Sequence, residues 1–153
     1  MMIIHKIHVT SKMVRIGYIE NIETAPRAYT LKSAELARPE LYDAMTNVFE
    51  TLADGNQCFI AAGCQGIIED ITVKYNRDNS VACYILSGVM KGEDEVHAKF
   101  QTEKIYTQYR QGLNDAVYTA IKEAELFVRG KRAQMTLDIE AETPAQKLKG
   151  GVA

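Results

Sequence analysis

Several cations and two tyrosines in the last third of this 153-residue sequence have side chains whose chemistry is that of an anion site. Arginine binds phosphate through a planar bidentate fork, lysine binds it as a point charge, and a tyrosine ring stacks on a nucleotide base. In a symmetric oligomer, such patches from two or more subunits can converge on one ligand. The side chains expected to contribute to such a site are Arg129, Lys131, Arg132, Arg110, Tyr106 and Tyr109.

The cations around Gly130 also have a simpler interpretation. A helical pattern precedes them, and glycine is the residue that most often follows the end of a helix. Cations in the last turn of a helix interact with the negative end of its macrodipole, a contribution of about 0.3–1 kcal/mol each. Helix capping and phosphate binding therefore remain two alternatives for Arg129, Lys131 and Arg132.

The stretch QMTLDI, residues 134–139, is a second motif. It resembles the peptide with which bacterial and phage replication proteins dock onto the sliding clamp: Gln, two variable residues, Leu and a closing hydrophobic residue. In that mode Gln134 is the polar anchor, and Leu137 and Ile139 enter an apolar pocket. The alternation is also typical of a β-strand, inside the fold or added to a neighbouring subunit. Strand and docking peptide both remain possible.

Motifs for catalysis or metal binding are missing, including the phosphate loop, GxGxxG, HExxH, the EF-hand loop and GxSxG. His5 and His8 are three residues apart, which on a regular strand places them on opposite faces, where they cannot share a metal ion. The neighbours Glu69 and Asp70 also alternate across an expected strand. Without a CxxC pair, reduced and buried thiols are expected for Cys58, Cys64 and Cys83. We expect a protein that is not an enzyme and needs no cofactor.

Hydrophobic periodicity predicts the elements that must position these residues. Alternating runs over residues 3–9 and 14–18 indicate a β-hairpin, with Ile3, His5, Ile7 and Val9 on one face. Residues 20–37 are expected to be mainly a loop. A helix should run from residue 39 to residues 54–55, opened by proline. Three antiparallel strands follow between residues 67 and 101.

A last amphipathic helix is predicted over residues 113–128, with Asn114 as its N-cap and Gly130 as its C′ residue. The expected fold class is α+β, an antiparallel sheet of about five strands (hairpin plus three-stranded meander) packed with two main helices. Residues 1–140 form the single predicted domain, and residues 141–153 are expected to be a flexible or weakly docked tail.

Charge and hydropathy narrow the classes of partner. Eighteen basic and twenty acidic side chains give a net charge of −2, which disfavours duplex DNA, whose binding requires many neutralised phosphates. No apolar run approaches membrane-spanning length, and the first ten residues are unlike a signal peptide. The expected location is the cytoplasm.

The sequence resembles a family of small bacteriophage and prophage proteins whose last helix closes with Gly-Lys-Arg-Ala-Gln before a Met-Ser-Leu-Phe-like end. The matching pieces are His8-Val9-Thr10, residues 39–52, the strands of residues 67–100, and residues 113–137 ending in GKRAQMTL. Asp138 stands where that family tends to have an aromatic residue. The general plan is also similar to viral sponge proteins that capture nucleotide signals of Thoeris or CBASS defence.

These resemblances imply a non-enzymatic counter-defence protein. As a homo-oligomer, it would sequester a nucleotide-type immune signal or bind a defence protein. The alternative is a replication or recombination accessory protein that binds single-stranded DNA, or the sliding clamp through residues 134–139.

Overall fold

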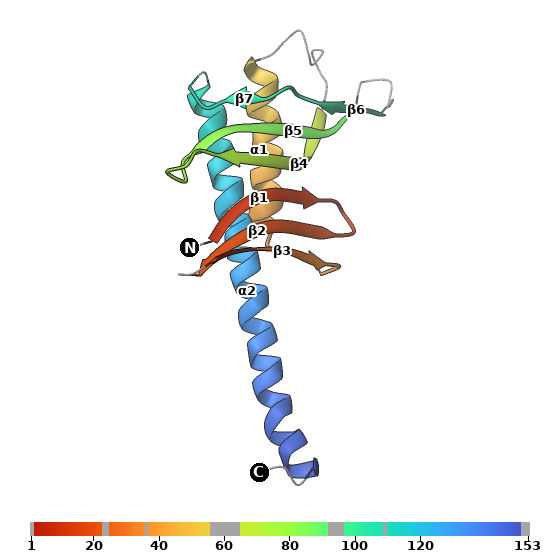
Figure 1. The fold of residues 1–153 in the computed structure, drawn as a ribbon. Coiled ribbons are helices and arrows are strands. Elements are labelled where there is room, and N and C mark those ends of the chain that lie inside the picture. The colour runs from red at the N-terminus through yellow and green to blue at the C-terminus, as the bar shows by residue number, and fades with distance from the viewer. Residues whose placement is uncertain are drawn as a thin grey trace.

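Seven antiparallel strands form one sheet, and both helices lie on the same face of it (Figure 1). The computed structural model describes residues 2–22, 25–35, 37–55, 65–91, 97–108 and 110–150, with the backbone alone for residues 21–22, 55 and 132–150. The strand order is β3-β2-β1-β4-β5-β6, and β7 pairs with β5. The elements are β1 (Met2–Val9), β2 (Val14–Ile22), β3 (Ala25–Ser33), α1 (Pro39–Gly55), β4 (Gln65–Tyr75), β5 (Val81–Lys91), β6 (His97–Gln101), β7 (Ile105–Tyr106) and α2 (Gln111–Gly150).

The predicted α+β class, the hairpin and the meander are confirmed. The hairpin is β1 and β2, closed by a turn in which the Thr10 N–H donates to the Met13 carbonyl at 2.9 Å. The meander is β4, β5 and β6, and the turn between its first two strands contains Asn79 with φ of 67°. Asparagine tolerates this left-handed conformation better than most residues do.

β3 takes the place of most of the predicted loop over residues 20–37. It pairs with β2 along its whole length, and β2 itself runs to Ile22. Because β3 is an edge strand with mostly exposed side chains, it lacks the hydrophobic alternation that would reveal a strand. Pro26 is compatible with an edge strand, whose outer side makes no ladder hydrogen bonds. β7, with two residues, is too short to show a pattern.

The first helix, α1, forms as its sequence predicts. Pro39 is its first residue, a position where the missing N–H costs nothing because it would have no intrahelical acceptor. Leu41, Met45, Val48 and Leu52 recur at helical spacing, and each is at most 1% exposed. This buried stripe faces β4 and α2.

α2 begins earlier than predicted, so the N-cap assignment of Asn114 is wrong. The backbone N–H of Asn114 donates to the Arg110 carbonyl at 2.9 Å, which is already an intrahelical bond. The Asn114 side chain is buried and serves the core instead. Its Oδ1 accepts a hydrogen bond from the Tyr84 hydroxyl at 2.8 Å, and its Nδ2 donates to the Thr107 carbonyl at 2.5 Å.

α2 also continues through Gly130 to Gly150, so the predicted helix end at Gly130 is wrong. A glycine inside a helix costs about 1 kcal/mol relative to alanine, and the following residues KRAQ all favour helix or tolerate it. Residues 134–139 therefore have a helical backbone, and neither the predicted strand nor an extended peptide is present there. The helix crosses residue 140 without a break and projects beyond β3 (Figure 1).

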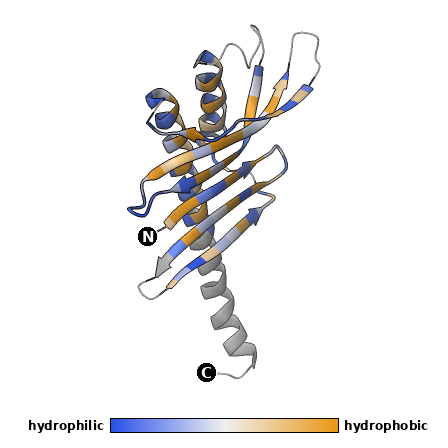
Figure 2. Ribbon diagram, turned by 45° about the horizontal axis from the view of Figure 1, so that its top comes forward, coloured by the Kyte–Doolittle hydropathy of each residue, from blue (hydrophilic) through white to orange (hydrophobic). Residues whose placement is uncertain are grey.

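The hydrophobic core lies between the sheet and the two helices. It combines buried side chains of β1, β2, β4 and β5 with those of α1 and α2, and the predicted α2 stripe contributes Leu113, Val117, Ala120, Ala124 and Val128. No helix among the described residues has an apolar stretch long enough to cross a membrane. The other face of the sheet is not covered by a helix (Figure 2).

Candidate binding site on the open face of the sheet

The face of the sheet that the helices leave uncovered, the open face, is shaped by two β-bulges. Ile4 and Ile7 in β1 are both fully buried, and so are Ile68 and Ile71 in β4. In a regular strand, residues three apart point to opposite faces, so each strand must contain an irregularity. The pairing register shifts after Ile4 and after Ile68. Each bulge therefore turns two consecutive side chains toward the open face.

The bulges overturn two predictions about which side chains share a face. His5 and His8 were expected on opposite faces of a strand, but the bulge in β1 places both on the open face. Glu69 and Asp70 likewise both point to the open face from β4, because the residues on either side of them are buried. Within the described ranges, however, no group of three His, Cys, Asp or Glu side chains is arranged to hold a metal ion.

A row of polar side chains crosses the open face from one edge of the sheet to the other. Its members are direct cross-strand partners, one from each of six neighbouring strands. Such pairs have Cβ atoms about 5 Å apart and interact directly. In the order β3, β2, β1, β4, β5, β6, this polar row consists of Lys32, Arg15, His8, Asp70, Ser87 and Gln101.

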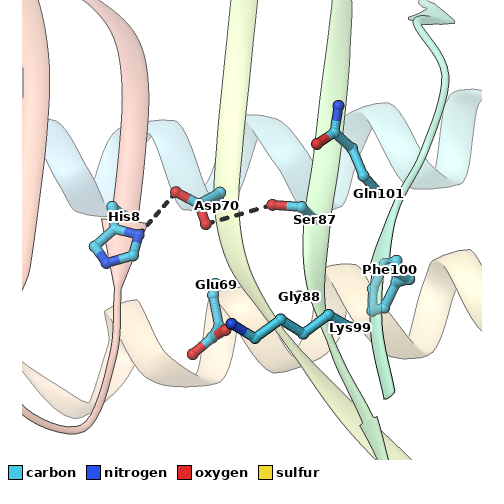
Figure 3. A pocket seen from close by; sticks show the side chains of 8 residues that line it. All are labelled: His8, Glu69, Asp70, Ser87, Gly88, Lys99, Phe100 and Gln101. Atoms are coloured by element: carbon cyan, nitrogen blue, oxygen red, sulfur yellow. Dashed lines mark hydrogen bonds and ion pairs between the residues drawn. The ribbon is translucent and has the colours of Figure 1, made fainter.

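Asp70 is the centre of the polar row because it binds a neighbour on each side. The His8 Nδ1 lies 2.8 Å from Asp70 Oδ1, and the Ser87 hydroxyl donates to Asp70 Oδ2 at 3.3 Å (Figure 3). A carboxylate only accepts, so the proton of this bond is on Nδ1 and the Nε2 of neutral His8 is an acceptor. Since Asp70 separates His8 from Ser87, the imidazole cannot remove the serine proton as in a Ser-His-Asp triad.

A cavity of about 470 Å³ opens beside Asp70, a volume within the range of small-ligand sites. Its lining contains the two carboxylates of β4 together with a lysine and an amide side chain of β6. Lys99 extends from β6 across β5 toward Glu69 (Figure 3). The cavity is lined by His8, Glu69, Asp70, Ser87, Gly88, Lys99, Phe100 and Gln101.

Among the described residues, the open face carries an excess of positive charge although the whole chain does not. Its strands place six cations there, one per strand of the six-strand order, against the two carboxylates of Glu69 and Asp70. The opposite side of the molecule carries α1, which has four carboxylates and no lysine or arginine. Because the net charge of the chain is −2, this separation directs anions to the open face. The six cations are Lys6, Arg15, Lys32, Lys74, Lys91 and Lys99.

His5 occupies the bulge of β1 and packs against the neighbouring strand. A Cβ atom added to Gly17 of β2 would lie 2.8 Å from His5 Cε1, so the imidazole occupies the space that the absent side chain leaves. Burial first, and then the nearby Lys6 ammonium, lower the pKa of His5 from its ordinary value of 6.5. The neutral imidazole is therefore the form that the fold favours.

The cations and tyrosines predicted to form one anion site lie in two separate groups. Arg110 and Tyr106 are near the beginning of α2, and Arg129 and Lys131 are in its middle. Arg129 comes nineteen positions after Arg110 along the helix, which at 1.5 Å per residue is roughly 29 Å. Within one copy of the chain, these side chains cannot contact the same small ligand.

Several of these predicted ligand-binding residues have partners inside the protein. The Arg110 guanidinium donates to the Thr51 carbonyl at 3.3 Å, in the last turn of α1. Arg129 forms an ion pair with Glu125 at 2.8 Å, one turn earlier in α2.

Lys131 pairs with Glu35, and its ammonium lies 5.7 Å from the centre of the Phe127 ring. In β7, Tyr106 is 49% exposed and is the cross-strand partner of Cys83 in β5.

For the remaining predicted residues, the structure describes either the backbone alone or nothing. Arg132, Gln134, Leu137 and Ile139 belong to the α2 backbone, and their role in binding a ligand or partner stays a prediction. Tyr109, Cys58 and Cys64 lie outside the described residues. Cys83 is free and buried, as predicted for a small apolar residue.

Sequence reasoning missed the polar row because the row depends on strand order. His8 and Asp70 are 62 residues apart, and β1 pairs with β4 across the intervening β2, β3 and α1. The available signal was an excess of polar side chains at alternate strand positions, such as Arg15 and Ser87. That signal identifies a solvated face, but it does not say which residues become neighbours.

Comparison of the chain with protein-family models, with curated proteins and with solved structures gave no match. The site must therefore be interpreted from its own geometry.

Proposed function

We propose that this protein binds a phosphate-bearing, nucleotide-type ligand on the open face and does not turn it over. The observation that carries the proposal is the excess of cations on this face in a chain of net charge −2. Phosphate groups are drawn from solution toward such a face. Cations on neighbouring strands, such as Arg15 and Lys32, then hold a phosphate by charge-assisted hydrogen bonds.

The biological role that fits such binding is counter-defence in a bacteriophage. A protein that captures a nucleotide immune signal without consuming it lowers the free concentration of that signal in proportion to the amount of protein. The resemblance to viral sponge proteins supports the same role and adds assembly as a homo-oligomer. The second group of cations, Arg129 to Arg132 on α2, would then be able to meet a ligand held by another subunit.

Binding without catalysis is favoured by the order of groups in the polar row. The Ser87 hydroxyl donates to Asp70, and among the described residues this carboxylate is the only general base within hydrogen-bond distance of it. The activation of a serine hydroxyl normally uses a neighbouring imidazole rather than a carboxylate. A second cavity, about 450 Å³ between α1 and β4, is lined by Glu50 and Asp54 and by no cation, so it repels phosphate.

Calorimetry with a panel of cyclic and ADP-ribose-type nucleotides tests the proposal. At least one nucleotide should bind, and the double variant Arg15→Glu/Lys32→Glu should bind it at least about tenfold more weakly, since hydrogen bonds to charged groups contribute about 1.5–3 kcal/mol. Lys122→Glu is the matched control, because it reverses one charge on the exposed surface of α2. Recovered ligand should be chemically intact.

Two results would contradict this proposal. One is the absence of any heat of binding and of any change in melting temperature across the panel. The other is multiple turnover of a nucleotide, which would make the protein an enzyme.

A second candidate function, binding of single-stranded DNA, is favoured by a continuous stripe of cations. The stripe runs over neighbouring strands β3, β2, β1 and β4 and spans about 14 Å, since strands are about 4.8 Å apart. Fluorescence anisotropy with a labelled oligonucleotide at several salt concentrations tests it. Four phosphate contacts predict a slope of log K against log salt of about −3. A slope near zero would show that the stripe does not bind DNA phosphates. The four cations of the stripe are Lys32, Arg15, Lys6 and Lys74.

A further inference from the structure

The cavity beside Asp70 combines hydrogen-bond acceptors and donors in a way that selects part of a nucleotide. Glu69 and Asp70 present carboxylate oxygens from β4, Gln101 presents an amide from β6, and Lys99 extends its ammonium from β6 toward the Glu69 carboxylate (Figure 3). A carboxylate repels phosphate, so the phosphates of a ligand belong over the cations. The group that enters between the carboxylates must itself donate hydrogen bonds.

Both carboxylates have unused acceptor capacity. Asp70 receives one hydrogen bond at Oδ1 from His8 and one at Oδ2 from Ser87, whereas an ionised carboxylate offers about four lone-pair positions. Glu69 makes no hydrogen bond or ion pair within the described part of the chain, and it is half-buried at the bulge of β4. The bulge thus holds two consecutive carboxylates at the edge of the cavity.

Vicinal hydroxyl groups are the neutral donors that such a pair of carboxylates fits best. In dinucleotide-binding folds an acidic side chain binds ribose in this way, by accepting a hydrogen bond from its 2′-hydroxyl. Sugar hydroxyls in the cavity would leave the attached phosphates within reach of Lys99 on one side or of Arg15, beyond His8, on the other. The cation and the carboxylates then recognise different parts of one molecule.

We propose that the cavity takes the free ribose diol of a nucleotide, so that the ligand class is a nucleotide with unesterified vicinal hydroxyls rather than one whose hydroxyls are closed into a phosphodiester ring. The proposal rests on the nucleotide-binding function above and names its ligand class. Glu69 and Asp70 accept hydrogen bonds from the diol, and Lys99 binds the neighbouring phosphate. In this arrangement, the Asp70 orientation depends on His8 and Ser87.

The experiment compares ligands with and without a free diol; AMP and 2′-deoxy-AMP differ in one hydroxyl alone, whereas 3′,5′-cyclic AMP also loses one phosphate charge. Affinities of the full chain for ADP-ribose, AMP, 2′-deoxy-AMP and 3′,5′-cyclic AMP are measured by calorimetry at one salt concentration. The wild type should bind a free-diol ligand at least about tenfold more tightly than its deoxy or cyclic counterpart. Glu69→Gln and Asp70→Asn should each reduce this ratio toward one. Lys99→Gln should weaken the binding of all four ligands and leave the ratio of their affinities unchanged.

The outcomes separate the two proposals. Binding of nucleotides with equal affinity for the diol and deoxy forms would overturn the diol assignment and leave the nucleotide-binding function in place. A diol preference unchanged in both Glu69→Gln and Asp70→Asn would also overturn it. If the wild type binds none of the four ligands nor any other nucleotide, the proposed function itself fails. Glu69→Gln leaves the His8–Asp70 hydrogen bond intact, so its result is independent of any loss of local order in Asp70→Asn.

Discussion

Gly130 provides a direct test of whether α2 is one continuous helix. A glycine at the end of a helix usually has positive φ, where alanine is strained and destabilising. A glycine inside a helix has the opposite property, because alanine there is more favourable by about 0.8–1.0 kcal/mol. In α2 the space around Gly130 is open, since no heavy atom would lie within 4 Å of an added Cβ.

The replacement Gly130→Ala should therefore stabilise the protein by up to about 1 kcal/mol. For a chain of this size, that gain corresponds to a rise in melting temperature of about 2–4 °C. The free energy of unfolding from urea titration and the helical signal in circular dichroism are the two measurements. Both should increase.

A matched control is Gly88→Ala in β5. There an added Cβ would lie 2.0 Å from the Ile67 carbonyl oxygen, which no small shift can accommodate, so this variant should lose several kcal/mol, in the range of severe core overpacking or more. A loss of stability in Gly130→Ala, or no gain in helical signal, would show that the helix ends at Gly130 and that the continuity argument is wrong.

Two further predictions concern buried polar groups. Because the pKa of His5 is lowered in the folded state, the unfolded chain takes up a proton first as pH falls through 6.5. Stability should therefore decrease between pH 7.5 and pH 5, and His5→Gln should reduce this decrease in urea titrations while the exposed control His97→Gln should not. Asn114→Ala removes the acceptor of the buried Tyr84 hydroxyl and should cost about 1–3 kcal/mol of unfolding free energy. Adding Tyr84→Phe should recover part of that cost. If the changes in unfolding free energy caused by the two substitutions were strictly additive, the hydrogen bond would contribute nothing.

The Tyr84 hydroxyl stays protonated under all ordinary conditions, since burial raises the pKa of Tyr84 to about 12. It is therefore a donor in its bond to Asn114 at every pH of interest. This hydrogen bond joins the central strand β5 to the beginning of α2. Asn114 at a helix start was read as a cap from sequence, because the tertiary partner that determines its role lies 30 residues away.

Elements with strong local periodicity could be predicted from the sequence. α1 has both an apolar stripe and a proline at its first position, and its bounds follow from these features. The edge strand β3 has neither stripe nor alternation, and its formation depends on the unpaired edge that β2 offers. The prediction that the helix ends at Gly130 is wrong for a related reason. Glycine is frequent at helix ends, but whether a helix ends at a glycine depends on whether the residues after it continue the helix.

The candidate site could not be predicted because it depends on two β-bulges. Binary alternation assigns every second residue to one face, and one extra residue reverses the assignment for the rest of the strand. The residues that this reversal misassigns are His5 and Glu69, which the bulges turn toward the open face beside His8 and Asp70. Strict alternation predicts Glu69 and Asp70 on opposite faces for the same reason.

The two bulges must occur together for the open face to have its charge distribution. If β1 were a regular strand, Ile4 and Ile7 could not both be buried. If Ile4 stayed in the core, His8 would then point toward the helices. If β4 were a regular strand and Ile68 stayed in the core, Asp70 would also be buried there, where an unpaired carboxylate costs several kcal/mol. Only when both strands are bulged do His8 and Asp70 meet on the open face at hydrogen-bond distance. The carboxylates that would bind a sugar and the cations that would bind its phosphates therefore share one surface because of two extra residues in neighbouring strands.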